Sequence, residues 1–357
     1  MTGTIPTELG YLTQLTYLNL GYNSLTGTIP TEFGLCVNAL TFDVDTNGLT
    51  GAIPSEMFMM KNLTDLDLRL NDLTGTIPSE IGLLTKLTTL NIRSNGLSGS
   101  LPSELGLMTS LVFASFRSNE LTGTIPSEVG MLRSMASFNC RTQAMSGTIP
   151  TELFMMTKLT LLSVRENGFT GAISSEIGHL TALKDIFVSA NKFSGSLPTE
   201  MGLLTSLEQA YFLSNSLTGT IPTELGLLTS LEEAHFYSNV FVGTIPSEIG
   251  MWNKVQQVNL RSNQLSGTLP SEIGAMTKLT YLSFRSNVLT GSIPSEVGRL
   301  AALQSIYLYE NNLDGTLPSE VGMMRRLVTF LVQTNALTGS IPSEVGLLTV
   351  LQNLYLF

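Results

Sequence analysis

The spacing of the prolines is the feature that most restricts how this chain can fold. All 14 prolines lie on one lattice of 24 residues, and Ser174 fills the only slot without a proline. A glycine stands three positions before every slot, and an asparagine recurs with the same period and is replaced once, by Gln143. None of the 15 registers contains an insertion or a deletion. We therefore expect residues 1–357 to form one repeat domain of about 15 registers without recognisable terminal caps, with Gln143 and Ser174 in phase.

Each repeat can be interpreted from its residue types. Leu18 and Leu20 have the two-residue spacing of a strand with one buried face. The amide of Asn23 can pair with backbone groups of neighbouring turns, which would otherwise be buried without partners. Pro30 suits the first residue of a short helical turn, and Gly34 at the end of that turn tolerates a positive φ. Since one such repeat cannot bury its apolar side alone, stacking must stabilise the whole.

The pattern LxxLxLxxNxLTGxIPxELGxLT resembles the plant-type leucine-rich repeat of receptor-kinase ectodomains and secreted inhibitor proteins. The threonine-rich stretch at 219–230 also looks like leucine-rich-repeat proteins of algae such as diatoms. The resemblance covers essentially the whole chain. It implies an α/β repeat solenoid, a right-handed horseshoe or superhelix with a parallel β-sheet on the concave face and short 3-10 or α turns on the convex face. It also implies an extracellular or cell-surface location.

The chain departs from this family in its ends. Family ectodomains usually carry cysteine-paired caps, whereas this sequence begins and stops inside a repeat. We therefore expect it to be the repeat segment of something longer, or an incomplete gene model. Uncapped ends also suggest possible self-association.

Composition excludes several functional classes. A formal net charge of −10 argues against nucleic-acid binding. No apolar run approaches the roughly 18–20 residues that span a bilayer, and no signal peptide is visible. Cys36 and Cys140 are too few for a disulfide scaffold and are expected to be buried thiols. His179 and His235 fall at different repeat positions, and no HExxH, GxSxG, GxGxxG or P-loop string occurs, so we expect no enzyme, no catalytic residue and no cofactor.

A glutamate stands two places after every proline slot, from Glu8 to Glu344. These 15 carboxylates are more than half of the 28 acidic residues, so the acidity belongs to one face. A carboxylate in the first turn of a helix is favoured by the free N–H groups there. Because no second oxygen ligand recurs beside each glutamate, we expect a structural role and no metal site.

The strand positions that face outward are the informative ones, because the scaffold does not dictate them. One such column holds seven of the 11 arginines, five of them in consecutive repeats. Strands in a sheet are about 4.8 Å apart, so these five should form a row of like charges. The alternative is that they pair with nearby carboxylates and keep the surface soluble. The arginines of the column are Arg69, Arg93, Arg117, Arg141, Arg165, Arg261 and Arg285. The nearby carboxylates are Glu120 and Glu166 beside the row and Asp43, Asp65, Asp67 and Asp72 before it.

Aromatic residues occupy the gap in which the column lacks arginine. We expect these side chains, with the arginines, to bind a ligand on the concave face, since such residue types are enriched in binding hot spots. The predicted ligand-binding residues are Arg93, Arg117, Arg141, Arg165, Phe187, Tyr211, Leu213, His235, Tyr237, Arg261 and Arg285. A second aromatic patch is predicted at Tyr307, Tyr309, Tyr355 and Phe357.

The function predicted from these features is non-catalytic recognition of a peptide, a protein or an anionic glycan, by a receptor-like or secreted protein. The alternative is a structural, adhesion or ice-binding solenoid. In that case the working surface would be the rows of Thr-Gly-Thr strings, such as 26–28 and 74–76, which resemble the threonine rows of some ice-binding solenoids.

Two registers carry phenylalanine where the other 13 have glycine at the end of the outer turn. Phenylalanine is poorly suited to a positive φ. We therefore expect the turns around Phe58 and Phe154 to lengthen into a more regular helix, with Met59 or Met155 partly exposed.

Overall fold

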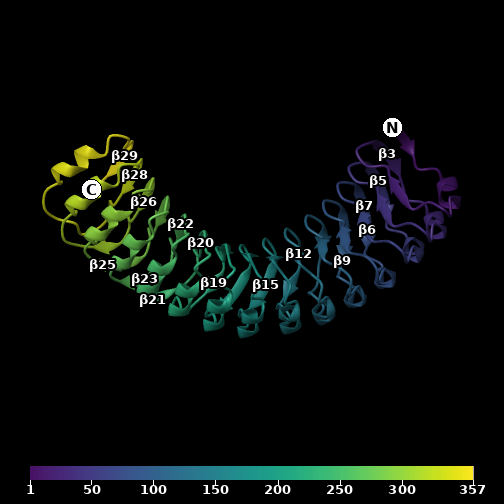
Figure 1. Ribbon diagram of the computed structural model, residues 1–357, viewed down its shortest axis with the longest axis horizontal. Coiled ribbons are helices and arrows are strands. Elements are labelled where there is room, and N and C mark those ends of the chain that lie inside the picture. The colour runs from purple at the N-terminus through teal and green to yellow at the C-terminus, as the bar shows by residue number, and fades with distance from the viewer. Residues whose placement is uncertain (357) are drawn as a thin grey trace. The chain divides into compact units, whose positions relative to one another are not determined.

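The computed structural model describes residues 1–356, and the chain divides into two compact units, Met1–Gly171 and Ala172–Phe357. Within each unit a repeat contributes a three-residue strand to a main parallel sheet, in most repeats a second short strand, and a five-residue 3-10 turn. Figure 1 shows the repeats following one another in order, with the strands stacked side by side inside each unit. The predicted α/β repeat solenoid of parallel strands and short turns is confirmed.

The first unit contains three sets of elements. Its main-sheet strands are β2 (Tyr17–Asn19), β4 (Thr41–Asp43), β6 (Asp65–Asp67), β8 (Thr89–Asn91), β10 (Phe113–Ser115), β12 (Ser137–Asn139) and β14 (Leu161–Ser163). Its second strands are β1 (Thr2–Thr4), β3 (Ser24–Gly27), β5 (Gly48–Ala52), β7 (Asp72–Thr76), β9 (Gly96–Gly99), β11 (Glu120–Leu121), β13 (Ser146–Gly147) and β15 (Gly168–Gly171). Its 3-10 turns are η1 (Thr7–Tyr11), η2 (Thr31–Leu35), η3 (Ser55–Met59), η4 (Ser79–Leu83), η5 (Ser103–Leu107), η6 (Ser127–Met131) and η7 (Thr151–Met155).

The second unit repeats this arrangement. Its main-sheet strands are β16 (Asp185–Phe187), β18 (Gln209–Tyr211), β20 (Glu233–His235), β22 (Gln257–Asn259), β24 (Tyr281–Ser283), β26 (Ser305–Tyr307), β28 (Thr329–Leu331) and β29 (Asn353–Tyr355). Its second strands are β17 (Lys192–Gly195), β19 (Ser216–Leu217), β21 (Val242–Thr244), β23 (Gln264–Gly267), β25 (Val288–Gly291) and β27 (Asn312–Leu313). Its 3-10 turns are η8 (Ser175–His179), η9 (Thr199–Leu203), η10 (Thr223–Leu227), η11 (Ser247–Met251), η12 (Ser271–Ala275), η13 (Ser295–Arg299), η14 (Ser319–Met323) and η15 (Ser343–Leu347).

The recurring asparagine links each repeat to the one before it, as predicted. Asn71 is buried, and its Nδ2 donates to the backbone oxygens of Val44 at 3.0 Å and of Leu68 and Arg69 at 3.2 Å. Its Oδ1 accepts a hydrogen bond from the backbone N–H of Leu49 at 3.1 Å. One amide therefore satisfies buried backbone groups of two successive repeats, which is why the position recurs.

Both defective registers stay in phase within their own units, and this prediction is confirmed. Gln143 keeps part of the asparagine role, because its Oε1 accepts from Leu121 N at 3.1 Å and its Nε2 donates to Phe116 O at 2.5 Å. The strands on either side of it still pair with partners 24 residues apart. At the slot without proline, the hydroxyl of Ser174 accepts from the backbone N–H of Glu176 at 3.2 Å, and η8 keeps the usual five residues.

The glycine at the end of each outer turn is explained by space and not by a positive φ. Gly34 lies outside the left-handed region, so our prediction for this position was wrong. A Cβ at Gly34 would instead collide with the backbone oxygen of Glu56 in the following turn. At Gly34, glycine therefore allows η2 to stack closely on η3.

The expected longer helices around the two phenylalanines are not formed. Both η3 and η7 are five-residue 3-10 turns like the others, with Phe58 and Phe154 buried. Met59 and Met155 are exposed, and this part of the prediction is confirmed. The helix prediction failed because it rested on a positive φ that this position does not have.

A positive φ occurs at a different position, immediately before the recurring asparagine. Residues other than glycine adopt φ values of 52–58° there in 14 repeats. Leu70 and Glu166, with φ of 54° and 57°, are among them although neither has a side chain suited to this conformation. The backbone must turn at this point to leave the main sheet, and stacking on the neighbouring repeats imposes the strain.

Candidate ligand-binding face

The open face of the main sheet is formed by strand residues whose side chains point away from the core. In the first unit five arginines occur at one register position, each two residues beyond the end of a main-sheet strand. All five are half-buried, so their aliphatic stems pack on the sheet while the guanidinium groups reach solvent. We call this set the arginine row: Arg69, Arg93, Arg117, Arg141 and Arg165.

The two ends of the arginine row are paired with carboxylates. Arg69 Nη2 lies 2.7 Å from Asp45 Oδ2, and its Nε lies 3.5 Å from Asp67 Oδ2. At the other end Arg165 Nε lies 3.6 Å from Glu166 Oε1. The charge of these two arginines is therefore compensated inside the protein.

The middle of the row is not compensated in this way. None of the ion pairs formed among residues 1–356 involves Arg93, Arg117 or Arg141. The pKa of Arg141 is lowered, first by burial and then by the positive charge of Arg165; the carboxylate of Glu166 opposes this shift, and Arg93 adds a smaller lowering effect. Its Nε is buried without a hydrogen-bond partner among the described residues. Three adjacent strands thus present positive charge that an external anion could neutralise.

In the second unit the same face carries a chain of rings, which we call the aromatic cluster: Phe187, Tyr211, His235 and Tyr237. The ring centroids of Phe187 and Tyr211 are 5.0 Å apart, and those of Tyr211 and His235 are 4.5 Å apart. His235 and Tyr237 meet at 6.2 Å with nearly perpendicular planes. Leu213 is half-buried in the loop after β18. The predicted patch is formed, but its rings are half-buried or buried against each other.

Arginines pack on two tyrosines of this unit. The guanidinium of Arg261 lies 4.3 Å from the ring centroid of Tyr237, and that of Arg285 lies 5.1 Å from that of Tyr309. These are cation–π distances. Arg261 and Arg285 therefore belong to the aromatic surface of the second unit. Within the described residues, no cation–π pair involves the middle of the arginine row.

Carboxylates border the aromatic cluster. The hydroxyl of Tyr211 donates to Glu233 Oε2, and His235 Nε2 lies 3.5 Å from the same oxygen. Burial lowers the pKa of His235, and the carboxylate of Glu233 opposes this shift. Burial also raises the pKa of Asp185 on β16. The cluster is therefore apolar at its centre and acidic at one edge.

Several residues of the open face were not predicted. Tyr281 packs on Tyr307 with ring centroids 5.4 Å apart and extends the second aromatic patch. Phe357, which was predicted for that patch, lies outside the described residues. Asp45 is 1% exposed and anchors Arg69. Asp45 lies in the arginine column, so that column contained its signal, whereas Tyr281 is the first residue of β24 and lies in a different column.

An exposed apolar column along the 3-10 turns was also missed, apart from Met59 and Met155. Its residues are the last of each turn and are exposed although most are large and apolar, and their 24-residue recurrence was visible in the sequence. In the first unit they are Tyr11, Leu35, Met59, Leu83, Leu107, Met131 and Met155.

The remaining sequence features have structural roles. Both cysteines are buried and free, and burial raises the pKa of Cys36 and raises that of Cys140 to about 12, which keeps both as thiols. Glu80, in the first turn of η4, accepts a hydrogen bond from the Ser79 hydroxyl at 3.3 Å. His179 pairs with Glu176 on η8, far from the strand position of His235 in the repeat.

The threonine strings also serve the scaffold. The hydroxyl of Thr26 donates to the backbone oxygen of Gly3 in the preceding repeat at 3.5 Å. The methyl of Thr4 lies 2.9 Å from the point where a Cβ of Gly27 would stand, so it covers the glycine of the next repeat. In the first unit the second strands form a sheet only from β1 to β11, with β13 and β15 paired separately.

A family model described as Leucine Rich Repeat matches five segments of the chain. These segments are residues 14–36, 62–84, 86–108, 254–276 and 278–300. Among curated proteins, none matches the sequence significantly. None of the turns within residues 1–356 has the length and apolar character of a membrane-spanning helix.

Solved structures match the chain over its whole length. The plant peptide hormone receptor RGFR1 in complex with RGF2 is 32% identical with a TM-score of 0.87, and the match covers 100% of this chain and 61% of that chain. The Arabidopsis receptor kinase HAESA, in complex with the peptide hormone IDA and the co-receptor SERK1, is 29% identical with a TM-score of 0.85, covering 100% and 68%. The Leptospira interrogans LRR protein LIC12759 is 30% identical with a TM-score of 0.77, covering 99% and 93%. The chain thus spans less than two thirds of the length of RGFR1.

Proposed function

Since the chain belongs to the plant-type leucine-rich-repeat family, we propose that it is a non-catalytic recognition domain for an extended peptide or protein segment. The segment carries an anionic group that binds the middle of the arginine row in the first unit. Its setting is extracellular or at the cell surface, as the receptor part of a longer protein.

The observation that carries this proposal is the uncompensated charge of Arg93, Arg117 and Arg141. Three guanidinium groups stand on adjacent strands without ion-pair partners among the described residues, and like charges on neighbouring strands repel one another. Arginine pairs with carboxylate, sulfate or phosphate through two parallel hydrogen bonds. An anionic side chain or terminus of a ligand would remove the repulsion and satisfy the buried Nε of Arg141.

The aromatic cluster supplies a second type of contact in its own unit. Aromatic rings give large contact areas at low entropic cost, and Tyr is enriched in binding hot spots. Tyr237 and Tyr211 are half-buried, so apolar side chains of a ligand can cover their remaining surface.

The solved relatives support the ligand class. The plant peptide hormone receptor RGFR1 was solved in complex with RGF2, and HAESA was solved in complex with the peptide hormone IDA and the co-receptor SERK1. Both relatives are thus receptors that were solved with their partners bound. We propose that the present chain likewise binds a peptide or protein segment, and we assign it no particular hormone.

The test is a binding screen of the purified chain against tyrosine-sulfated, phosphorylated and unmodified peptide arrays, with sulfated glycans as a separate array. For the best peptide, Arg117→Glu and Arg141→Glu should each weaken binding by about 1.5–3 kcal/mol, roughly 10- to 100-fold. Wild-type affinity should fall as salt rises, because exposed ion pairs are screened over about 8–10 Å. Tyr237→Ala should weaken binding with little change in the salt dependence.

Arg299→Glu is the control, since Arg299 is exposed on η13, outside the main sheet. It should leave affinity within about twofold. Binding that survives both charge reversals, or that is lost only when Thr74, Thr76, Thr122 and Thr124 are replaced, would place the ligand elsewhere. A chain that binds only sulfated glycans would overturn the peptide assignment.

A further inference from the structure

One asparagine of the chain is followed, two places on, by a hydroxyl residue. Among all the asparagines only Asn62 begins an Asn-x-Ser/Thr string, as Asn62-Leu63-Thr64. In secreted proteins this string is the acceptor sequence for N-linked oligosaccharides, provided that the middle residue is not proline. The recurring asparagines cannot form it, because the residue two places after each of them is leucine or phenylalanine.

The structure places this string at the surface. Asn62 is half-buried in the turn between η3 and β6, and its middle neighbour Leu63 is fully buried and anchors the turn. Asn62 Nδ2 donates to Val37 O at 2.9 Å, and its Oδ1 accepts from Lys86 Nζ at 2.8 Å, both at the exposed surface. Such a surface turn is the structural setting that the acceptor string requires.

The acceptor nitrogen has capacity for a second substituent. Asn62 Nδ2 carries two N–H groups, and among residues 1–356 it donates one hydrogen bond, to Val37. An N-linked oligosaccharide replaces one hydrogen of this nitrogen and leaves the other. The bond to the preceding repeat and the oligosaccharide are therefore chemically compatible.

The string lies against exposed apolar side chains of the preceding repeat. The carbonyl of Val37 accepts from Asn62, and that of Leu40 accepts from Thr64 Oγ1 at 3.0 Å. Val37 is 46% exposed and Leu40 is 48% exposed. In the column of Val37 every other repeat has threonine, a charged or amide residue, or alanine. The one acceptor string thus stands beside the one large apolar residue of this column.

A groove continues this apolar surface along the outer turns. Its volume is about 490 Å³, and Val37 lines it together with Leu35 and Met59. Leu35 is 49% exposed and Met59 is 48% exposed. Contiguous exposed apolar surface in a soluble protein usually has something that covers it.

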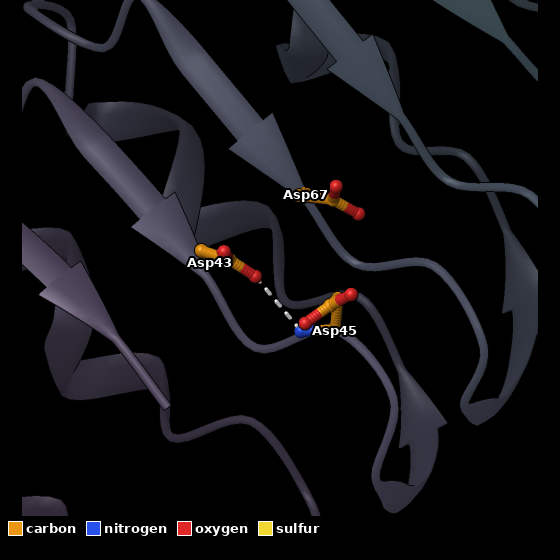
Figure 2. A group of neighbouring side chains, drawn as sticks. All are labelled: Asp43, Asp45 and Asp67. Atoms are coloured by element: carbon orange, nitrogen blue, oxygen red, sulfur yellow. Dashed lines mark hydrogen bonds between the residues drawn. The ribbon is translucent and has the colours of Figure 1, made fainter. Parts of the chain in front are cut away.

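The opposite end of the same strands is polar. Figure 2 shows Asp43 and Asp67 at the carboxyl ends of β4 and β6, with Asp45 beyond Asp43. The backbone N–H of Asp45 donates to Asp43 Oδ1 at 3.0 Å, and Arg69 Nη2 lies 2.7 Å from Asp45 Oδ2. Asn62 precedes β6, so a substituent on it begins at the other end of the strand from the arginine row.

We propose that Asn62 carries an N-linked oligosaccharide, which covers the apolar surface around Val37 and Leu40. Its donor is an oligosaccharide linked to a polyprenyl diphosphate. A bond forms between Asn62 Nδ2 and the anomeric carbon, the bond from that carbon to the diphosphate oxygen breaks, and Nδ2 loses one proton. The polyprenyl diphosphate leaves. The site rests on the extracellular setting proposed above and does not depend on the peptide ligand.

The test expresses the whole chain behind a cleavable secretion signal in a eukaryotic host and measures its mass before and after enzymatic removal of N-linked glycans. Wild type should carry one oligosaccharide. Asn62→Gln and Thr64→Ala should carry none, whereas Thr64→Ser should keep it. Alanine is tolerated at the position of Thr64, since Ala136 occupies it in another repeat. A secreted wild type without a glycan, or a glycan that remains in Asn62→Gln, would overturn the proposal.

The preceding repeat offers a matched site without the hydroxyl. Asn38 Nδ2 donates to Thr13 O at 2.9 Å, as Asn62 does to Val37, but residue 40 is leucine. Leu40→Thr completes an acceptor string there and should add a second oligosaccharide. Modification of Asn38 in wild type, or no gain in Leu40→Thr, would contradict the argument from the string and its turn. Circular dichroism confirms that each variant is folded before it is scored.

Self-association tests the covering role. Enzymatically deglycosylated wild type should associate at a concentration several-fold lower than the glycosylated protein in sedimentation measurements. In the double variant Val37→Thr and Leu40→Gln, which uses residues found at these positions in other repeats, deglycosylation should have no such effect. An equal effect in the double variant would show that the oligosaccharide covers a different surface.

Glycopeptide mass spectrometry of the protein from its natural source separates this proposal from the proposed function. An extracellular protein with unmodified Asn62 would overturn the glycan alone. An intracellular protein would overturn the extracellular setting and the glycan with it. Peptide arrays that return no ligand would overturn the recognition role and leave the result at Asn62 unchanged.

Discussion

The guanidinium of Arg261 lies 4.3 Å from the centre of the Tyr237 ring, close enough for the cation to be attracted by the ring face. The next such pair in this unit, Arg285 and Tyr309, is more widely spaced at 5.1 Å. Arg261 Nε is buried without a hydrogen-bond partner among the described residues. The Tyr237 ring is thus a main stabilising partner of the Arg261 guanidinium. The pair of Arg285 and Tyr309 can be compared with it directly.

A double-mutant cycle measures this contact. Arg261→Ala and Tyr237→Ala should couple by about 0.5–1 kcal/mol in the free energy of unfolding, as expected for a partly exposed cation–π pair. The cycle of Arg285 and Tyr309 should give a smaller value because of its longer distance. Equal coupling in the two cycles, or none in the first, would contradict this interpretation.

Asn71→Ala should be strongly destabilising. The change removes three donated bonds and one accepted bond and leaves buried backbone groups of two repeats without partners, at a cost of about 2–4 kcal/mol. Denaturant unfolding gives the difference. Asn38→Ala is the control, since exposed Asn38 makes one bond, to Thr13 O at 2.9 Å, and its loss should cost less than about 1 kcal/mol.

Gln143→Asn should stabilise the protein. At the equivalent position one repeat later, Asn167 donates to the backbone oxygens of Cys140, Val164 and Arg165. The shorter amide at position 143 can make the corresponding set, for a gain of about 0.5–1.5 kcal/mol. The reverse change, Asn167→Gln, should lower the unfolding midpoint. A drop in stability for Gln143→Asn would mean that the longer side chain is preferred locally.

Leu70→Asn should also stabilise the protein. Leu70 is exposed and has a φ of 54°, a conformation that costs an ordinary residue about 1–2 kcal/mol and asparagine less. We expect a gain of about 0.5–1 kcal/mol in the free energy of unfolding. Leu83→Asn, on the exposed end of η4 where φ is not positive, should be neutral or destabilising. Equal effects of the two changes would argue against backbone strain as the cause.

His235→Asn should reduce the loss of stability in mild acid. Burial lowers the pKa of His235 in the folded protein below its ordinary 6.5, so the unfolded chain takes up the proton first as pH falls. Stability contributed by the neutral imidazole is therefore present above pH 6.5 and lost as pH falls below it toward the lower folded-state pKa. Asparagine is the residue found at the same position in β22.

Unfolding at pH 7.5 and pH 5.5 checks this prediction. Wild type should lose more stability between the two pH values than His235→Asn does. His179→Asn, at an exposed position on η8, should behave like wild type. Glu233 faces His235 and partly offsets the shift, so a larger pH effect is expected when Glu233→Gln is combined with wild-type His235.

The 24-residue pattern determined the scaffold. Strand positions, the 3-10 turns after each proline slot and the asparagine bonds all follow from residues that recur, because every repeat packs against a copy of itself. Each side chain of the pattern therefore meets the same neighbours in every register, and Gln143 and Ser174 cause no slip for the same reason. The columns of outward-facing residues could be read for that reason too, and the arginine row and the aromatic cluster lie where predicted.

Only the tertiary structure decided what the columns do, because charge compensation depends on distances across the sheet and on burial. It showed that Arg69 forms an ion pair with Asp45 whereas Arg141 forms none among the described residues, although both stand in one column. The positive φ that was expected at Gly34 is found instead at residues such as Leu70. Stacking imposes the conformation there, and the sequence has no glycine at that position to indicate it. Asp45 in the column and Gly21 before it have no recurring pattern, so the close packing of Asp45 Oδ1 against Gly21 could be found only once neighbouring repeats were placed side by side.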